Sequence, residues 1–147
     1  MAEPLVNLFG PLDTYLGPYI EYVLLALLVV NIGARALEYG RIRQQAADGG
    51  ADAITRHPLR VSTNLLLVVG SFYYMTVHHH GGLVFSTLVL GIFITDLFEF
   101  ESRKVEARRE IAIERPKGAI AASMLALLYI AYQTLFFVIQ PVWSSIV

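Results

Sequence analysis

The sequence predicts an all-α membrane protein: an antiparallel bundle of four transmembrane helices, with both termini extracytoplasmic and a short interfacial helix at the N-terminus. Composition is the first reason, because 56% of the 147 residues are hydrophobic and only 16% are charged, whereas soluble domains are about a quarter charged. The second is a series of four apolar stretches of about 17 to 23 residues, each enough to cross about 30 Å of hydrocarbon. The third is the grouping of all eleven lysines and arginines into two regions. One integral membrane domain over residues 1–147 is expected at this length.

The N-terminal segment and the first span open the chain. Residues 1–17 contain a few apolar side chains and a glycine–proline pair that stops a helix. This segment is too short to cross a bilayer, so we expect it to lie along the interface. Pro18 suits the first turn of a helix, and the first span is predicted at residues 18–40. A polar link with turn residues follows at residues 41–59.

The second and third spans are separated by a tight reversal. The second span is predicted at residues 60–78, after a proline that marks its start. The reversal is His78-His79-His80-Gly81-Gly82, and the third span is predicted at residues 83–100. In the third span small residues recur at every fourth position, which lets a neighbouring helix approach closely. They are Thr87, Gly91 and Thr95.

A strongly charged link at residues 101–116 joins the third span to the fourth. Residues 101–109 are expected to continue the third helix as an exposed spur. Apolar and charged residues alternate over residues 110–115, which predicts an extended return to the membrane. The fourth span is predicted at residues 117–140. Its small-residue face consists of Ala119, Ser123 and Ala126.

The distribution of basic residues predicts the orientation. One group flanks the first link and consists of Arg35, Arg41, Arg43, Arg56 and Arg60. The other occupies the link between the third and fourth spans and consists of Arg103, Lys104, Arg108, Arg109, Arg115 and Lys117. Because lysine and arginine accumulate in cytoplasmic loops, both links are expected inside the cell. We therefore expect a multi-pass protein of the plasma membrane with its N-terminus and C-terminus outside.

Composition and missing motifs argue against several classes of function. The net charge of −1 produces no field that would gather nucleic acid. The absence of cysteine excludes thiol redox chemistry and thiolate metal sites. The sequence contains no glycine-rich phosphate loop and no nucleophile elbow. We therefore expect neither an enzyme nor a nucleic-acid partner, and we predict no cofactor.

An intramembrane polar cluster is predicted on the cytoplasmic side of the bundle. Its members are Arg35, Glu38, Asn64, Asp96 and Glu99. An ionised side chain facing lipid costs about 2.5–3.5 kcal/mol, so these groups should face one another. We expect Arg35 to pair with Asp96 and Asn64 to hydrogen-bond to them. Two interpretations remain open: a structural clasp that fixes helix register, or an ion, proton or substrate site that opens to the cytoplasm.

The histidine turn is a candidate metal site. Histidine is the commonest metal ligand, and His78, His79 and His80 are consecutive. Consecutive residues of a helix point about 100° apart, so three of them cannot hold one ion unless the turn is irregular. A polar cap on a tight turn is therefore favoured over a metal site.

The charged link is a candidate docking surface. The basic residues that would contact a partner there are Arg103, Lys104, Arg108 and Arg109. Acids and bases balance in this link, which argues against a polybasic lipid switch. A partner-docking arm and a solvated helix end are both consistent with this pattern.

Several runs of the sequence resemble small four-span membrane proteins of unknown function from halophilic archaea. The runs are Arg56-His57-Pro58, Asn64-Leu65-Leu66-Leu67, His80-Gly81-Gly82, Asp96-Leu97-Phe98-Glu99-Phe100-Glu101 and Lys104-Val105-Glu106-Ala107-Arg108-Arg109-Glu110. The resemblance covers most of the chain. It implies an archaeal source and a membrane location, but no activity.

The expected function is that of a non-enzymatic accessory or assembly subunit of a membrane complex. Besides the lipid bilayer, its partner would be another membrane or cytoplasmic protein, or further copies of the chain. The alternative is a small oligomeric transporter or channel component that uses the polar cluster. An intramembrane enzyme or a metal-binding protein is the third possibility, for which the sequence provides the fewest motifs.

Overall fold

The structure is a computed structural model that describes residue 11 and residues 13–146. Within this part of the chain there are four long α-helices: α2 (Ile20–Gly49), α3 (Pro58–Val77), α4 (His79–Arg108) and α5 (Lys117–Ile146). Two short 3-10 helices accompany them, η1 (Gly17–Tyr19) and η2 (Ala51–Ala53). The prediction of an all-α fold is thereby confirmed. The predicted interfacial helix falls mostly outside the described residues.

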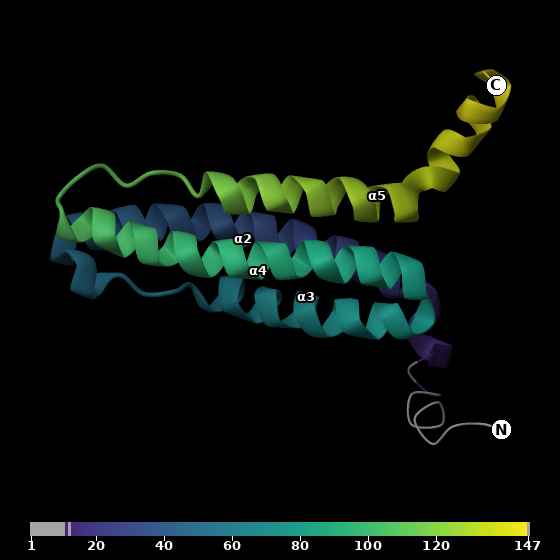
Figure 1. The fold of residues 1–147 in the computed structure, drawn as a ribbon, viewed down its shortest axis with the longest axis horizontal. Helices are drawn as coiled ribbons and strands as arrows, with labels where there is room; N and C mark the ends of the chain where they lie inside the picture. The colour runs from purple at the N-terminus through teal and green to yellow at the C-terminus, as the bar shows by residue number, and fades with distance from the viewer. Residues whose placement is uncertain (1–10, 12, 147) are drawn as a thin grey trace.

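The four helices form an antiparallel bundle (Figure 1). Each helix packs against the next in the chain, and α5 packs back against α2. Consequently the ends of α2 and α4 and the starts of α3 and α5 lie toward the same end of the bundle, which we call the basic end. The opposite end, where α3 turns into α4, is called the histidine end.

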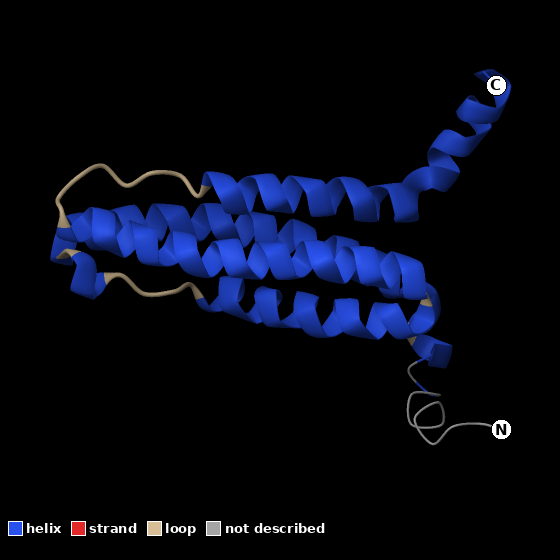
Figure 2. Ribbon diagram, in the orientation of Figure 1, coloured by secondary structure: helices blue, strands red, loops and turns tan. Residues whose placement is uncertain are grey.

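The helices differ in length in a way that shapes the basic end. Helices α2 and α4 each have 30 residues and are therefore about 45 Å long, whereas α3 has 20 residues and is about 30 Å long. Helices α2 and α4 extend past the starts of α3 and α5, and two links run back along them (Figure 2). The first link comprises residues 50–57 and the second link residues 109–116.

The predicted polar link at residues 41–59 is wrong over its first half, because residues 41–49 continue α2. The physical reason is a small second core at the basic end. Ile42 of α2 and Phe100 of α4 are buried there together with Ile54 of the first link. Ala46 and Ala107 pack against this core, so the extensions of α2 and α4 support each other. The expected exposed spur at residues 101–109 is helical, but it packs along one side.

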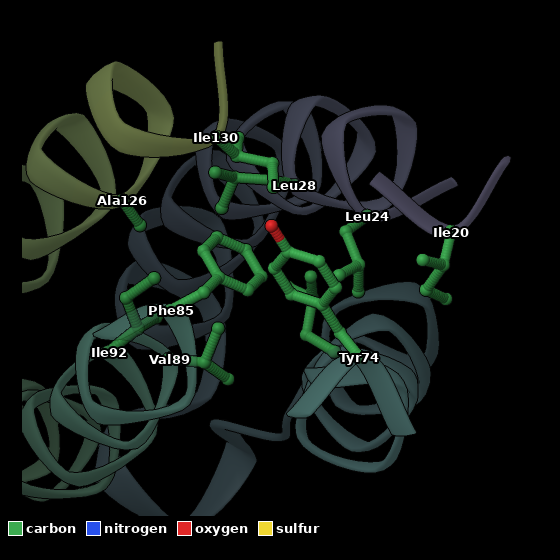
Figure 3. Close-up of a cluster of buried hydrophobic side chains, with 10 residues drawn as sticks. Ile20, Leu24, Leu28, Tyr74, Phe85, Val89, Ile92, Ala126 and Ile130 are labelled. Atoms are coloured by element: carbon green, nitrogen blue, oxygen red, sulfur yellow. The ribbon is translucent and has the colours of Figure 1, made fainter. Parts of the chain in front are cut away.

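The main core lies between all four helices (Figure 3). Buried side chains recur at intervals of three, four or seven residues on each helix, which is the spacing of one helical face. They are Ile20, Leu24 and Leu28 of α2, Leu67 and Tyr74 of α3, Phe85, Val89 and Ile92 of α4, and Ala126 and Ile130 of α5. Ala126 and its neighbours Ala119 and Ser123 are fully buried, so the small-residue face predicted for the fourth span is used inside the bundle.

The outer surface of the bundle is apolar. Every long helix exposes large hydrophobic side chains; examples are Val29 on α2, Val69 on α3, Phe98 on α4 and Leu128 on α5, which are 53%, 67%, 70% and 69% exposed. Large exposed apolar surfaces mark protein or membrane contacts. Three helical segments are long and apolar enough to cross a membrane: Gly17–Gly49, His79–Arg108 and Lys117–Phe136. Helix α3 is not among these three segments, and its first two turns carry Arg60, Thr63 and Asn64.

At the histidine end only His78 separates α3 from α4. The expected reversal at residues 78–82 is therefore shorter than predicted, and His79 to Gly82 belong to the first turn of α4. The two backbones approach very closely here. A Cβ atom at Gly82 would lie 2.1 Å from Cα of Met75, which no real side chain tolerates. Glycine at this position is thus required by the turn.

Helix α5 continues beyond its predicted end at residue 140. Pro141 lies inside the helix, which reaches Ile146. A proline in a helix clashes with the carbonyl four residues earlier and bends the helix. Figure 1 shows the C-terminal part of α5 turning away from the bundle.

Candidate functional site

Asp96 of α4 is the centre of the polar residues at the basic end. Its side chain is buried, and the residue is 5% exposed. The carboxylate accepts hydrogen bonds from the guanidinium groups of Arg56 and Arg60, one on each oxygen. It also accepts a hydrogen bond of 2.9 Å from Nδ2 of Asn64. Because Arg60 is 0% exposed, this ion pair is a buried one.

A chain of hydrogen bonds extends from Asp96 to the other helices. Nδ2 of Asn31 on α2 donates to Oδ1 of Asn64 at 2.8 Å. Arg35 on α2 then donates to Oδ1 of Asn31 at 3.3 Å and to Oγ of Ser123 on α5 at 2.6 Å. We call this set the polar layer, and it comprises Asn31, Arg35, Arg56, Arg60, Asn64, Asp96 and Ser123. All four long helices contribute to it, so it holds them in one register.

The predicted pair between Arg35 and Asp96 is wrong. Asp96 instead forms ion pairs with Arg56 and Arg60, while Arg35 is hydrogen-bonded to two neutral side chains. The cause is the position of α3: it packs beside α4 and brings Arg60 to the level of Asp96. The expected proximity of Asn64 and Asp96 is present.

Glu38 and Glu99, the two glutamates predicted for the polar cluster, accept hydrogen bonds from backbone N–H groups, whereas Asp96 accepts them from side chains. Oε2 of Glu38 on α2 accepts a hydrogen bond of 2.9 Å from the backbone N–H of His57, the residue that caps α3. Oε1 of Glu99 on α4 accepts one of 3.2 Å from the backbone N–H of Ala119 in the first turn of α5. A carboxylate is favourable at a helix N-terminus, where backbone N–H groups are unpaired. Helix α2 thus anchors the start of α3, and α4 anchors the start of α5.

The space enclosed by these groups is small. A cavity of about 20 Å³ is lined by charged residues, among them Arg60, Asp96, Glu99 and Arg103. About 10–15 Å³ is enough for one water molecule. Among the described residues, Oε2 of Glu99 and Nη1 of Arg60 are buried without a hydrogen-bond partner from the protein. A single water molecule fits the cavity, but a larger solute does not.

The four candidate docking residues fall into two pairs. Arg103 is buried, with its Nε 2.6 Å from a carboxylate oxygen of Glu106. Lys104 is half-buried, with its amino group 5.1 Å from the centre of the Phe100 ring. Arg108 and Arg109 are exposed at the end of α4. The structure therefore leaves only the second pair available to a partner.

The histidine turn is exposed at the other end of the bundle. His78, His79 and His80 line an open depression together with Glu21 and Tyr74. The ring of His78 contacts the ring of Tyr74 edge to face, with 5.7 Å between centroids. The described part of the chain contains no group of three or more histidine, cysteine, aspartate or glutamate side chains placed to hold a metal ion.

Sequence reasoning missed Asn31, Arg56, Arg60 and Ser123 as members of the polar layer. A signal was present for Arg60, because it precedes Asn64 by four residues and so lies on the same helical face. Arg56 lies in the first link, where its side chain is held over the Phe100 ring at 4.7 Å. No local pattern predicts that contact. Ser123 was assigned to a helix-packing face, and its hydroxyl acts as an acceptor from that face.

Comparison with known proteins identifies a family without assigning an activity. No curated protein and no solved structure matches the chain. One family model matches residues 3–147, which is almost the whole sequence. The chain therefore belongs to the family described as Domain of unknown function (DUF7313).

Proposed function

We propose that the chain is a four-span protein of the plasma membrane with both termini extracytoplasmic. Three helical segments meet the length and hydropathy expected of a span, and the surface of α3 supports a fourth. Its polar residues Arg60, Thr63 and Asn64 are buried, whereas Leu66 and Val69 on its outer face are 52% and 67% exposed. A helix that is polar toward its neighbours and apolar outward suits a lipid environment. The gathering of the basic residues at one end supports a cytoplasmic location for that end.

We further propose that the protein is a non-enzymatic accessory subunit of a membrane complex. The observation that carries this proposal is the closed polar layer. Its one carboxylate, Asp96, is paired with Arg56 and Arg60, Arg35 is hydrogen-bonded to Ser123 of the neighbouring α5, and the cavity beside them has room for about one water molecule. The same observation counts against the alternative of a solute transporter, which needs a binding site that opens to water. The layer instead has the properties of a clasp that makes the bundle rigid.

The surface proposed to meet the partner is the stripe of small residues on α4. Thr87 and Thr95 direct their hydroxyl groups to carbonyl oxygens of their own helix. A Cβ atom added at Gly91 would have no neighbour within 4 Å. The stripe therefore lies on the outside of the bundle, unlike the buried stripe of α5. Small residues on an outer face allow the backbone of a second helix to come close.

The test is isolation of the chain from its native membranes in mild detergent, followed by mass spectrometry. The expected result is a reproducible second protein that is lost when Gly91→Leu fills the stripe. Gly33→Leu is the matched control, because Gly33 is exposed on α2 and also has no neighbour within 4 Å. A homo-oligomer of defined size without a second protein would contradict the proposal. So would equal loss of the partner in both variants.

A further inference from the structure

A groove between α2 and α5 opens on the side of the bundle near the basic end. Its volume is about 230 Å³. Ile32 of α2 and Ile120 and Met124 of α5 form an apolar wall. Ile120 and Met124 are 37% and 40% exposed, so this wall is continuous with the apolar outer surface of the bundle. Two arginines, Arg35 and Arg115, also line the groove, together with Ala36, Tyr39 and Pro116.

The charged residues that line the groove are both positive, although Arg35 also borders the neighbouring cavity that contains Glu38, Asp96 and Glu99. Neither Asp nor Glu lines the groove itself. Arg35 is 4% exposed, and its Nε is buried without a hydrogen-bond partner among the described residues. The guanidinium of Arg115 lies over the ring of Tyr39, 5.1 Å from its centroid. No carboxylate within the described residues lies within 4.0 Å of either guanidinium.

The position of Arg115 is supported by the second link. The hydroxyl of Tyr39 on α2 donates a hydrogen bond of 3.1 Å to the carbonyl oxygen of Ile113. This bond ties the link to α2, and the same tyrosine ring faces Arg115. Arg35 is held by Ser123 and Asn31. Arg35 is therefore held in place before any ligand arrives, and Arg115 lies over an anchored aromatic ring, which lowers the entropic cost of binding an anion.

We propose that this groove binds one anionic phospholipid of the membrane. Its phosphate would lie between Arg115 and Arg35, and an acyl chain would lie along Ile32, Ile120 and Met124. Arg115 precedes α5, and Ile120 and Met124 lie one and two turns into that helix, so the exposed side of α5 changes from basic to apolar away from the basic end. Basic pockets between transmembrane helices on the cytoplasmic side suit anionic headgroups. A soluble phosphate would satisfy the arginines but would leave the apolar wall without a ligand.

This inference rests on the proposed placement in the membrane. The experiment uses the full-length chain purified in detergent, with thermal unfolding measured after addition of phosphatidylglycerol or phosphatidylcholine at one ionic strength. Phosphatidylglycerol is expected to bind more tightly and to raise the unfolding temperature more. Arg115→Gln should weaken phosphatidylglycerol binding about fivefold, which is the effect of one basic residue near an anionic headgroup. Arg115 is exposed and makes no described ion pair, so this variant should fold.

Arg109→Gln is the matched control, because Arg109 is an exposed arginine of the same link that does not line the groove. Equal weakening by both substitutions would overturn the site, since it would indicate a diffuse surface charge. Equal stabilisation by inorganic phosphate would also overturn it in favour of a simple anion site. No preference for phosphatidylglycerol would do the same. A chain recovered only from the soluble fraction would instead contradict the membrane placement.

Discussion

The bundle consists of two halves that are built alike. The first half is α2, the first link and α3, and the second half is α4, the second link and α5. The first helix of each half, α2 or α4, has 30 residues and is followed by a residue with positive φ, Gly50 in the first half and Glu110 in the second. Each following helix is preceded or begun by a proline, Pro58 or Pro116. In both halves a glutamate of the long helix accepts a hydrogen bond from the start of the next helix.

The halves differ in the charge that they bring to the polar layer. Arg35 stands three residues before Glu38 in the first half, and Asp96 stands three residues before Glu99 in the second. Corresponding positions thus carry opposite charges. The first half also supplies Arg56 and Arg60, whose only described carboxylate partner is Asp96 of the second half. The two halves therefore share one architecture, and Arg56 and Arg60 of the first half need Asp96 of the second half as their buried counter-charge.

Removing the charge between the halves should have the largest effect. In Asp96→Asn, Arg60 would remain buried at 0% exposure without a carboxylate. Loss of one partner of a buried ion pair costs about 3–5 kcal/mol. We expect a fall of this size in the free energy of unfolding, measured by circular dichroism during titration with denaturing detergent. If the variant lost a transport activity and kept its stability, the clasp interpretation would be wrong.

The next largest effect is expected at the joint between the halves. Gly82→Ala places a methyl group against the backbone of Met75. Overpacking of this kind costs about 1–3 kcal/mol, more than the gain in helix propensity. Gly91→Ala on the same helix has no neighbour within 4 Å and should be neutral or stabilising. The same detergent titration would compare both, and equal stability of the two variants would contradict the close approach.

The two glutamates provide a direct test of the parallel between the halves. Glu38→Ala should cost about 2 kcal/mol and Glu99→Ala about 1 kcal/mol, because each leaves a helix-terminal N–H group unpaired. The difference is expected because Glu38 is 5% exposed and its hydrogen bond is shorter. Hydrogen exchange should show the loss first at the start of α3 for Glu38→Ala and at the start of α5 for Glu99→Ala. Loss at the same place in both variants would contradict this assignment.

The smallest effect is expected just after α2 and α4, where the residue with positive φ is a glycine in the first half and a glutamate in the second. Glu110 has φ of 57° and follows α4. The N–H groups of Glu110 and Ile111 bond to carbonyl oxygens of Ala107 and Glu106, which is the Schellman pattern of a helix end. Glycine adopts this conformation without the cost of about 1 kcal/mol that other residues bear. Glu110→Gly should therefore raise the free energy of unfolding by about this amount, whereas Gly50→Ala should lower it.

Much of the fold was predictable because apolar stretches and prolines mark the helices directly. The starts of α3 and α5 follow from Pro58 and Pro116, and the number of long helices follows from the apolar stretches. The extension of α2 was missed because its residues are mostly polar. Only the spacing of Ile42 and Ala46, four residues apart, indicates the buried side of that extension.

The partners in the polar layer were harder to predict. The sequence indicates that Arg35, Asn64 and Asp96 lie at a similar depth, because each is about one turn from a span boundary. It does not determine which helices are neighbours or how each is rotated. Those two properties decide that Asp96 meets Arg60 and that Arg35 meets Ser123. The similarity of the two halves was also not apparent from the sequence, because the halves share the order of their elements but few identical residues.

Under the proposed four-span placement, the single-residue connection between α3 and α4 bears on how the chain would enter a bilayer. Arg60 and Asp96 lie on these two helices, so their opposite charges neutralise each other within one hairpin. A hairpin with that internal pair avoids the expense of exposing two separate ions to hydrocarbon. The middle of the chain is thus suited to insertion as a unit, to which the outer helices α2 and α5 are then added from either side.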